Sequence, residues 1–303
     1  MVRARFGESG GKRLIRIGLA GWGDHPSLYR RVRQTGASGK LKAYSGWFDI
    51  VEVDATFYAI QPERVTARWT SETPDGFGFI VKAYQGMTGH ARGGVPYADT
   101  ASMFAAFRAS IEPMRAAGKL FAVLFQYPPW FDCTREHVDK LREARALMDG
   151  IPCALEFRNR TWFEEGMRER ALAFMKREGW IHGVCDEPQA GEGSVPIVEE
   201  ATDAELTIVR FHGRNAAGWN AGGSGWRDVR YLYRYTEAEL EEWIGRLKRL
   251  EARSRAVCVI FNNNSGGDAA DNALQLMRML GLRPPRGGFD PPAEPEQMDL
   301  FDL

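Results

Sequence analysis

Charged side chains interrupt or follow several apolar segments of this sequence, and their types suit acid–base chemistry. Glu52, Glu156, Asp186 and His212 are candidate proton-transfer groups, and Lys82 is a cation at the end of an apolar segment. An ionisable group inside an apolar segment costs free energy unless it is paired or takes part in binding or catalysis. We therefore predict that these five residues form the catalytic part of a polar site.

A second set of residues near the same segment ends is suited to ligand binding. Arginines bind phosphate oxygens through two hydrogen bonds, and aromatic rings stack on bases or sugars. The predicted substrate-binding residues are Trp22, Tyr58, His90, Gln126, Arg158, Trp162, Arg210, Arg214, Asn262 and Asn263. The alternative for the charged members of both sets is a structural network of salt bridges inside the fold.

Carboxylates and imidazoles are also ligands of divalent metals. We predict Glu156, Asp186 and His212 as ligands of Mg, Mn or Zn, although their positions in different segments give no spacing signature. Other site signatures are absent: the sequence has no HExxH helix and no GxSxG elbow, and residues 7–13 lack the spacing of a phosphate-binding P-loop. The four cysteines are far apart, which favours free thiols over a cysteine-built zinc site.

Residues 206–236 combine positive charge with aromatic rings. The segment holds five arginines against the single acidic residue Asp228, and its aromatic residues include Trp219 and Tyr231. Arginines with interleaved aromatic residues are typical of sites for nucleic acids or phosphorylated ligands. The alternatives are a long loop packed by its own aromatic residues and a sugar-binding loop.

Eight short segments have the continuous hydrophobicity of strands that are covered on both faces, which is typical of parallel sheets. These segments are Ile15–Ala20, Ile50–Asp54, Gly78–Lys82, Phe121–Gln126, Cys153–Phe157, Ile181–Cys185, Leu206–Phe211 and Val257–Phe261. Helical patterns lie between them, at Pro62–Ser71, Thr100–Ala117, Thr134–Met148, Glu169–Glu178, Thr236–Ala252 and Asp268–Leu280.

This alternation predicts an α/β fold, a single-domain TIM-type (β/α)8 barrel over residues 14–282. The runner-up is an open doubly wound sheet, which is disfavoured because no predicted strand is followed by a dinucleotide-binding glycine fingerprint. In a barrel the active site lies at the carboxyl ends of the strands, where both sets of predicted site residues belong.

The ends of the chain differ from the body. The chain of 303 residues carries 40 basic and 40 acidic residues, so its formal net charge is zero and bulk electrostatic coating of DNA is excluded. We predict a basic N-terminal arm at residues 1–13 and a proline-rich disordered tail at 283–303. The sequence has no visible secretory signal and no apolar run of membrane-spanning length, so we expect a cytoplasmic protein.

Several motifs occur in the order found in a known family. They are Gly21–Trp22, Val51–Tyr58, Phe79–Lys82, Phe125–Pro128, Glu156–Arg158, Asp186–Pro188, Arg210–Arg214 and Phe261–Asn263. Over about residues 15–281 the chain resembles the YecE-like family, domain of unknown function 72. The resemblance implies a TIM-type barrel and no established reaction. Asp54 departs from the asparagine expected there, which changes the charge of the pocket.

The end of the tail resembles a second known pattern. Residues 297–301 resemble the short peptide by which bacterial DNA polymerases and repair proteins bind the replication sliding clamp. The partner-binding residues are then Gln297, Met298, Leu300 and Phe301. The apolar members would bury their side chains in a groove of the clamp, and the proline-rich linker would give the peptide reach. The alternative is a chance apolar terminus or one that folds back on the barrel.

Three hypotheses for function follow. The leading one is a DNA-metabolism enzyme or nucleic-acid-binding protein, associated with repair, that acts on a phosphodiester or nucleotide at the barrel rim and is tethered to the clamp. As an enzyme it would be a metal-dependent hydrolase. The second is a carbohydrate-active hydrolase that pairs Glu156 with Glu52 or Asp186. The third is a non-enzymatic adaptor.

Overall fold

The structure is a computed structural model, and it describes residues 14–23, 25–29, 37–222 and 225–285. The predicted basic arm at 1–13 and the clamp-binding peptide at 297–301 lie outside the described residues.

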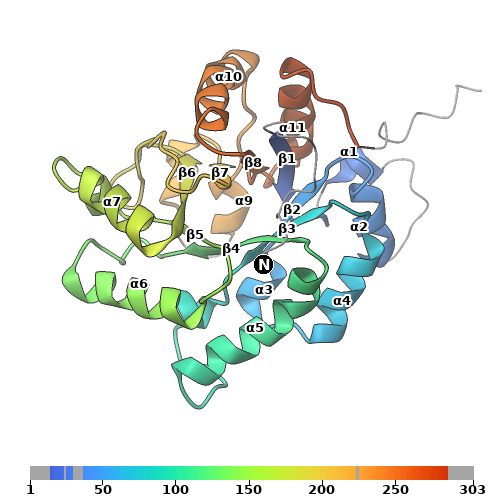
Figure 1. Cartoon of the computed structure of the whole chain (residues 1–303). Helices are drawn as coiled ribbons and strands as arrows, with labels where there is room; N and C mark the ends of the chain where they lie inside the picture. The colour runs from blue at the N-terminus through green and yellow to red at the C-terminus, as the bar shows by residue number, and fades with distance from the viewer. Residues whose placement is uncertain (1–13, 24, 30–36, 223–224, 286–303) are drawn as a thin grey trace, which may run out of the picture.

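Eight parallel strands close into a barrel, in which each strand pairs with the next along the chain and β8 pairs with β1 (Figure 1). The prediction of a TIM-type (β/α)8 barrel is therefore confirmed. The strands are β1 (Leu14–Ala20), β2 (Ile50–Val53), β3 (Gly78–Lys82), β4 (Leu120–Gln126), β5 (Cys153–Glu156), β6 (Trp180–Asp186), β7 (Leu206–Phe211) and β8 (Ala256–Phe261).

Helices surround the barrel, and the six that the sequence predicts begin and end within one residue of the predicted bounds. They are α4 (Glu63–Glu72), α5 (Thr100–Ala116), α6 (Arg135–Leu147), α7 (Arg168–Glu178), α10 (Glu237–Glu251) and α11 (Asp268–Met279). The sequence patterns did not predict α1 (Pro26–Tyr29), α2 (Ala37–Tyr44), α3 (Ala55–Tyr58), α8 (Ala216–Trp219), α9 (Trp226–Arg230) or the 3₁₀ turns η1 (Gln85–Thr88) and η2 (Arg160–Phe163).

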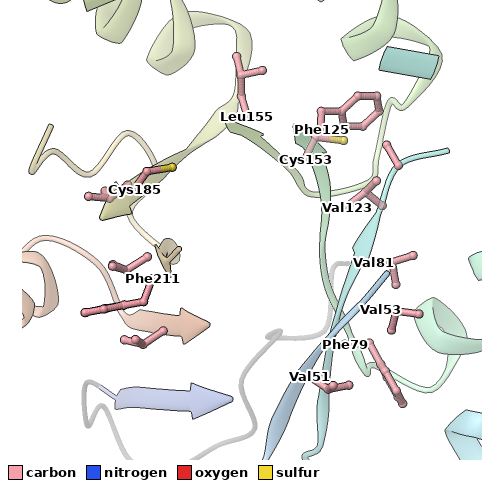
Figure 2. Packing of buried hydrophobic residues seen from close by; sticks show 14 of the residues in the cluster. Val51, Val53, Phe79, Val81, Val123, Phe125, Cys153, Leu155, Cys185 and Phe211 are labelled. Atoms are coloured by element: carbon pink, nitrogen blue, oxygen red, sulfur yellow. The ribbon is translucent and has the colours of Figure 1, made fainter. Parts of the chain in front are cut away.

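The barrel has an inner and an outer apolar layer because strand side chains alternate between its two faces. The inner cluster includes Ile80, Leu124 and Ile208. The outer cluster, between strands and helices, includes Val81 and Phe125 (Figure 2). Since apolar side chains fill the barrel interior below, the polar side chains at the carboxyl ends of the strands gather above this packed floor.

Two further sequence-based expectations concern thiols and membranes. The four cysteines are free, and Cys133 is the one that is partly exposed, as the free-thiol prediction requires. Among the described residues, the helices are too short or too polar for any of them to cross a bilayer.

Candidate functional site

Arg210 lies at the centre of the upper barrel. Its Nε and Nη2 atoms donate to the two carboxylate oxygens of Glu52, at 2.8 and 2.5 Å, and its Nη1 donates to Glu156 at 2.7 Å. All three side chains are fully buried. The arginine thus joins strand β7 to β2 and β5 across the barrel, and a guanidinium with two carboxylates satisfies charges that would otherwise be costly to bury.

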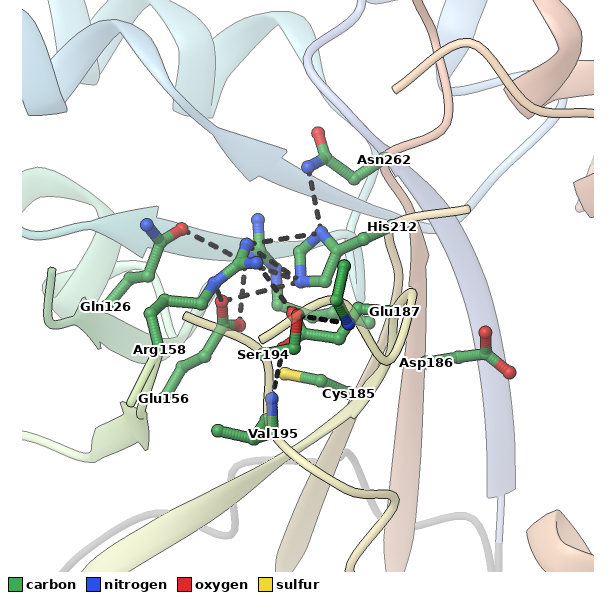
Figure 3. A network of polar contacts seen from close by, with 12 residues as sticks. Gln126, Glu156, Arg158, Cys185, Asp186, Glu187, Ser194, Val195, His212 and Asn262 are labelled. Carbon is green, nitrogen blue, oxygen red and sulfur yellow. Dashed lines mark hydrogen bonds and ion pairs between the residues drawn. The ribbon is translucent and has the colours of Figure 1, made fainter. Parts of the chain in front are cut away.

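Arg158, just beyond β5, extends this network toward the rim. Its Nε donates to Glu156 at 2.8 Å, and its Nη1 donates to Glu187 at 2.6 Å (Figure 3). The second oxygen of Glu187 accepts the backbone N–H of Val195 at 2.6 Å. We call Glu52, Glu156, Arg158, Glu187, Arg210 and His212 the central network.

His212 is held as a neutral ring inside this network. Its Nε2 lies 3.4 Å from Glu156 and 3.2 Å from Arg158 Nη2, and its Nδ1 lies 3.0 Å from the side-chain nitrogen of Asn262. Burial, followed by the charges of the two network arginines, holds the pKa of His212 well below its usual value. The imidazole therefore carries no charge at neutral pH.

The network carboxylates differ in their affinity for a proton. Burial acts to raise the pKa of Glu156, but Arg210 and Arg158 outweigh it and hold that pKa well below its usual value. For Glu187, burial wins over the opposing effects of Arg158 and the Val195 N–H, and its pKa is raised to about 7. Glu156 is thus a permanent anion, whereas Glu187 titrates near neutrality.

Asp186 lies outside the network, which corrects its predicted place beside Glu156 and His212. In the β6–β7 register Cys185 pairs with Arg210, whose side chain faces inward, so the next residue, Asp186, faces the helices (Figure 3). Its carboxylate accepts hydrogen bonds from Arg214, Tyr235 and Trp243. Arg214 pairs with Asp186 and Glu239 and so does not join the central network either.

The donor set does not fit the predicted divalent metal. The atoms that approach within 4.8 Å of one another belong to Glu156, Cys185 and His212. Glu156 already binds two guanidinium groups, whose positive charges oppose a further cation. Burial and the nearby Glu156 and Glu187 raise the pKa of the Cys185 thiol well above its usual value, so it stays protonated. We assign no metal to this site.

The segment between β7 and α10 is described at residues 212–222 and 225–236 and carries Trp219 over the central network, and we call these described residues the covering loop. Its Trp219 is 2 % exposed, and the guanidinium carbons of Arg158 and Arg230 lie 5.1 and 4.5 Å from its ring centroid. Above it opens a cleft of about 620 Å³, the rim cleft, lined by Trp130, Asn159, Glu192, Trp219, Asn220 and Arg230 among others.

Next to the rim cleft, four rings form a row of edge-to-face contacts that ends at Trp130. Successive ring centroids from Tyr58 to Phe57, His90 and Trp130 are 5.3, 5.1 and 5.9 Å apart. Lys82 lies 4.9 Å from the Phe57 ring centroid and 3.4 Å from Asp54. We call these four rings the aromatic row.

The remaining predicted binding residues divide between the rim and the core. Gln126 accepts a hydrogen bond from Arg210 at 3.4 Å and so belongs to the site. Trp162 instead stacks on Phe157 in the outer core, and its indole donates to the Phe131 carbonyl.

Two more predicted binding residues do not join the central network. Trp22 packs edge-to-face on Trp69. Asn263 is buried and donates to the Tyr233 carbonyl and to Asn272, which fixes the end of the covering loop.

Sequence reasoning left several rim residues out of the predicted site. Cys185 and Glu187 flank Asp186, and strict alternation from Arg210 would have placed Cys185 inside the barrel. Trp219 and Arg230 belong to the arginine-rich segment that the sequence singled out. Nothing in the sequence distinguishes the exposed Trp130 from the buried Trp162.

Comparison with known proteins places this architecture in a family. The profile described as "Protein of unknown function DUF72" matches residues 16–298. The UPF0759 protein YunF of Bacillus subtilis is 55 % identical over 290 residues, which cover 95 % of this chain and all of that protein.

Solved structures of DUF72 family proteins have the same fold as this chain. A DUF72 family protein from Enterococcus faecalis superposes with a TM-score of 0.84 at 36 % identity, covering 94 % of this chain and 100 % of that one. A DUF72 family protein from Thermotoga maritima gives a TM-score of 0.74 at 29 % identity, covering 88 % and 99 %. The chain belongs to the DUF72 family.

Proposed function

We propose that the rim cleft binds a phosphate-bearing ligand with an aromatic base, either a nucleotide or a nucleic-acid strand. The observation that carries this proposal is the arrangement of Arg158, Trp219 and Arg230, in which two guanidinium groups approach one indole ring at the base of the cleft. Guanidinium groups bind phosphate oxygens, and aromatic rings stack on bases.

The cleft carries charges of both signs, since Arg230 lines it together with the carboxylates of Asp132 and Glu192, and an anion would bind at the Arg230 side. Burial, followed by the like charge of Arg158, lowers the pKa of Arg230. A phosphate bound to Arg230 from the cleft would offset this repulsion. The indole Nε1 of Trp219 is buried and has no hydrogen-bond partner among the described residues, so it offers a donor to a ligand oxygen.

The same geometry supports binding better than glycoside hydrolysis. A pair of carboxylates for that reaction needs one that can carry a proton. The pKa of Glu156 is held low. Burial raises the pKa of Glu52, but its side chain is fully buried and both of its oxygens accept hydrogen bonds from Arg210, so it does not reach a ligand at the rim. Asp186 faces the helix layer instead of the barrel interior. No pairing of Glu156 with Glu52 or Asp186 therefore provides a general acid at the rim.

Direct binding measurements test the proposal. Fluorescence anisotropy with labelled nucleotides and oligonucleotides is expected to show binding that Arg230→Ala weakens by about 10- to 100-fold, because a charge-assisted contact to phosphate is lost. Arg253→Ala is the matched control, since Arg253 pairs with Glu200 near the start of β8, at the opposite end of the barrel. Absence of binding to every probe at low salt would refute the proposal.

The clamp-binding tail remains part of the proposed role in DNA metabolism. The four predicted contact residues of the tail lie outside the described residues, and they are Gln297, Met298, Leu300 and Phe301. Capture of the full-length chain by immobilised sliding clamp, abolished by the double substitution Leu300→Ala and Phe301→Ala, would support it. Equal capture of both proteins would refute it.

A further inference from the structure

Exposed apolar side chains of the described residues concentrate at the rim. The large hydrophobic residues with substantial exposure are Tyr58 at 54 %, Trp130 at 57 %, Val229 at 38 % and Leu232 at 45 %. The first two lie in the aromatic row and the last two in the covering loop, so they stand on both sides of the rim. A cluster of this kind at one end of a barrel marks a binding surface.

The aromatic row is fixed in place before any ligand binds. Thr56, next to Phe57, donates to the Lys82 carbonyl at 2.7 Å and ties α3 to β3. The Thr88 hydroxyl is hydrogen-bonded to His90 Nδ1 at 2.9 Å. The rings thus present a preorganised surface, which lowers the entropic cost of stacking a ligand on them.

The charges near the row suit a polyanion with uncharged bases. Burial, followed by the charges of Lys82 and Arg158, lowers the pKa of His90 to about 4, so its ring is neutral at pH 7 and stacks as an ordinary aromatic surface. Lys82 lies 4.9 Å from the centroid of the Phe57 ring. One cation, Lys82, therefore lies beside the aromatic row, and a cation next to stacking rings is the pattern of single-strand binding sites.

We propose that the aromatic row binds unpaired bases, so that the ligand at the rim is a single-stranded nucleic acid and not a duplex. This inference rests on the proposed function of the rim cleft. Bases within a duplex are covered on both faces by their neighbours and present no face to Tyr58 or Trp130. Bases of a single strand can leave their stack and lie on these exposed rings.

Trp130 connects the row to the cleft. It contacts His90 in the row, with ring centroids 5.9 Å apart, and it also lines the rim cleft together with Trp219 and Arg230. A strand whose phosphates reach Arg230 can therefore place a base on Trp130. The row adds the preference for unpaired bases to the phosphate binding that the arginines supply.

The test compares a labelled oligothymidine of about 12 nucleotides with a duplex of similar length. The wild-type chain is expected to bind the single strand about 10-fold more tightly than the duplex, and Trp130→Ala to weaken single-strand binding by about 5- to 150-fold. Trp130→Phe, which keeps an aromatic face, is the matched variant and should restore most of the affinity. Because Trp130 is 57 % exposed, thermal unfolding should be nearly unchanged in both variants.

Two results would overturn the inference and leave the proposed function standing. The first is equal affinity of the wild-type chain for strand and duplex. The second is unchanged single-strand affinity in Trp130→Ala. In both cases Arg230→Ala still weakens binding, so the proposed function stands. If the row instead bound a protein partner, Trp130→Ala would leave single-strand affinity unchanged, which is the second result. Absence of binding to any nucleotide probe would instead refute the proposed function itself.

Discussion

Arg158 is the residue at which the buried and the exposed parts of the rim meet. Its Nε and Nη1 atoms bind Glu156 and Glu187, while its guanidinium carbon lies 5.1 Å from the centroid of the Trp219 ring below the rim cleft. The carboxylates fix the guanidinium group and keep its charge close to the cleft. Arg158 is only 2 % exposed, so its fixed charge acts on a ligand from beneath the Trp219 ring, and Arg230 is the arginine that lines the cleft.

The titration of Glu187 gives a prediction at this scale. Its pKa is about 7 in the folded protein and 4.5 in an unfolded chain. The folded state therefore binds more protons between these pH values, and the stabilisation from protonated Glu187 is complete below about pH 4.5 and is lost as pH rises to about 7. Glu187→Gln cannot titrate, so its free energy of unfolding relative to the wild type should rise across this window, by on the order of 3 kcal/mol.

Urea unfolding at a series of pH values measures this difference. Because all other titratable groups are shared by the two proteins, their contributions largely cancel in the comparison. A difference in unfolding free energy that stays constant between pH 4.5 and 7 would contradict the assigned shift.

At the scale of elements, Asp186 anchors the covering loop to helix α10. It accepts hydrogen bonds from Arg214 and Tyr235 of the loop and from Trp243 of the helix, at 2.7, 3.0 and 2.5 Å. The loop in turn carries Trp219 over Arg158. We therefore regard Asp186 as a positioning residue for the rim cleft.

Asp186→Asn is expected to lower the free energy of unfolding by about 3 kcal/mol, because charge-assisted bonds inside the fold are lost. Hydrogen exchange should also increase at residues 231–235, where the loop joins the helix. Thr236→Ala is the control: it removes the N-terminal cap of α10 at a cost of about 1 kcal/mol. Unchanged exchange in Asp186→Asn, or an equal increase in both variants, would contradict the anchoring role.

Sequence patterns predicted the long elements well because their signals are local. Hydrophobic runs predicted the eight strands, and a helical pattern from Thr236 predicted α10, which begins in the structure with a capping box between Thr236 and Glu239. Short helices such as α3 and α8 carry too few residues for a helical period. Their positions depend on contacts with strand ends, for example the hydrogen bond from Thr56 to the Lys82 carbonyl.

The candidate site could be predicted in composition but not in arrangement. Glu52, Glu156, Arg158, Arg210 and His212 do converge as the strand ends suggested. Which face of a strand a residue occupies depends on register, and an error of one position placed Asp186 inside the barrel in place of Cys185. Burial of Trp162 and exposure of Trp130 depend on tertiary packing, which a single sequence does not reveal.

At the scale of the whole molecule, 40 basic and 40 acidic residues cancel, yet the rim concentrates arginine charge and aromatic surface. The central claim is that this local site binds phosphates. Ligand binding should then release counterions, so the logarithm of the association constant should fall with the logarithm of the salt concentration.

The most direct test is this salt dependence, measured for a single-stranded oligonucleotide. With Arg230 and Lys82 as the phosphate contacts, the account predicts a slope of about −1.4, reduced in magnitude by about 0.7 in Arg230→Ala and unchanged in Arg253→Ala. A slope near zero in the wild-type chain, or the same slope in Arg230→Ala, would contradict it.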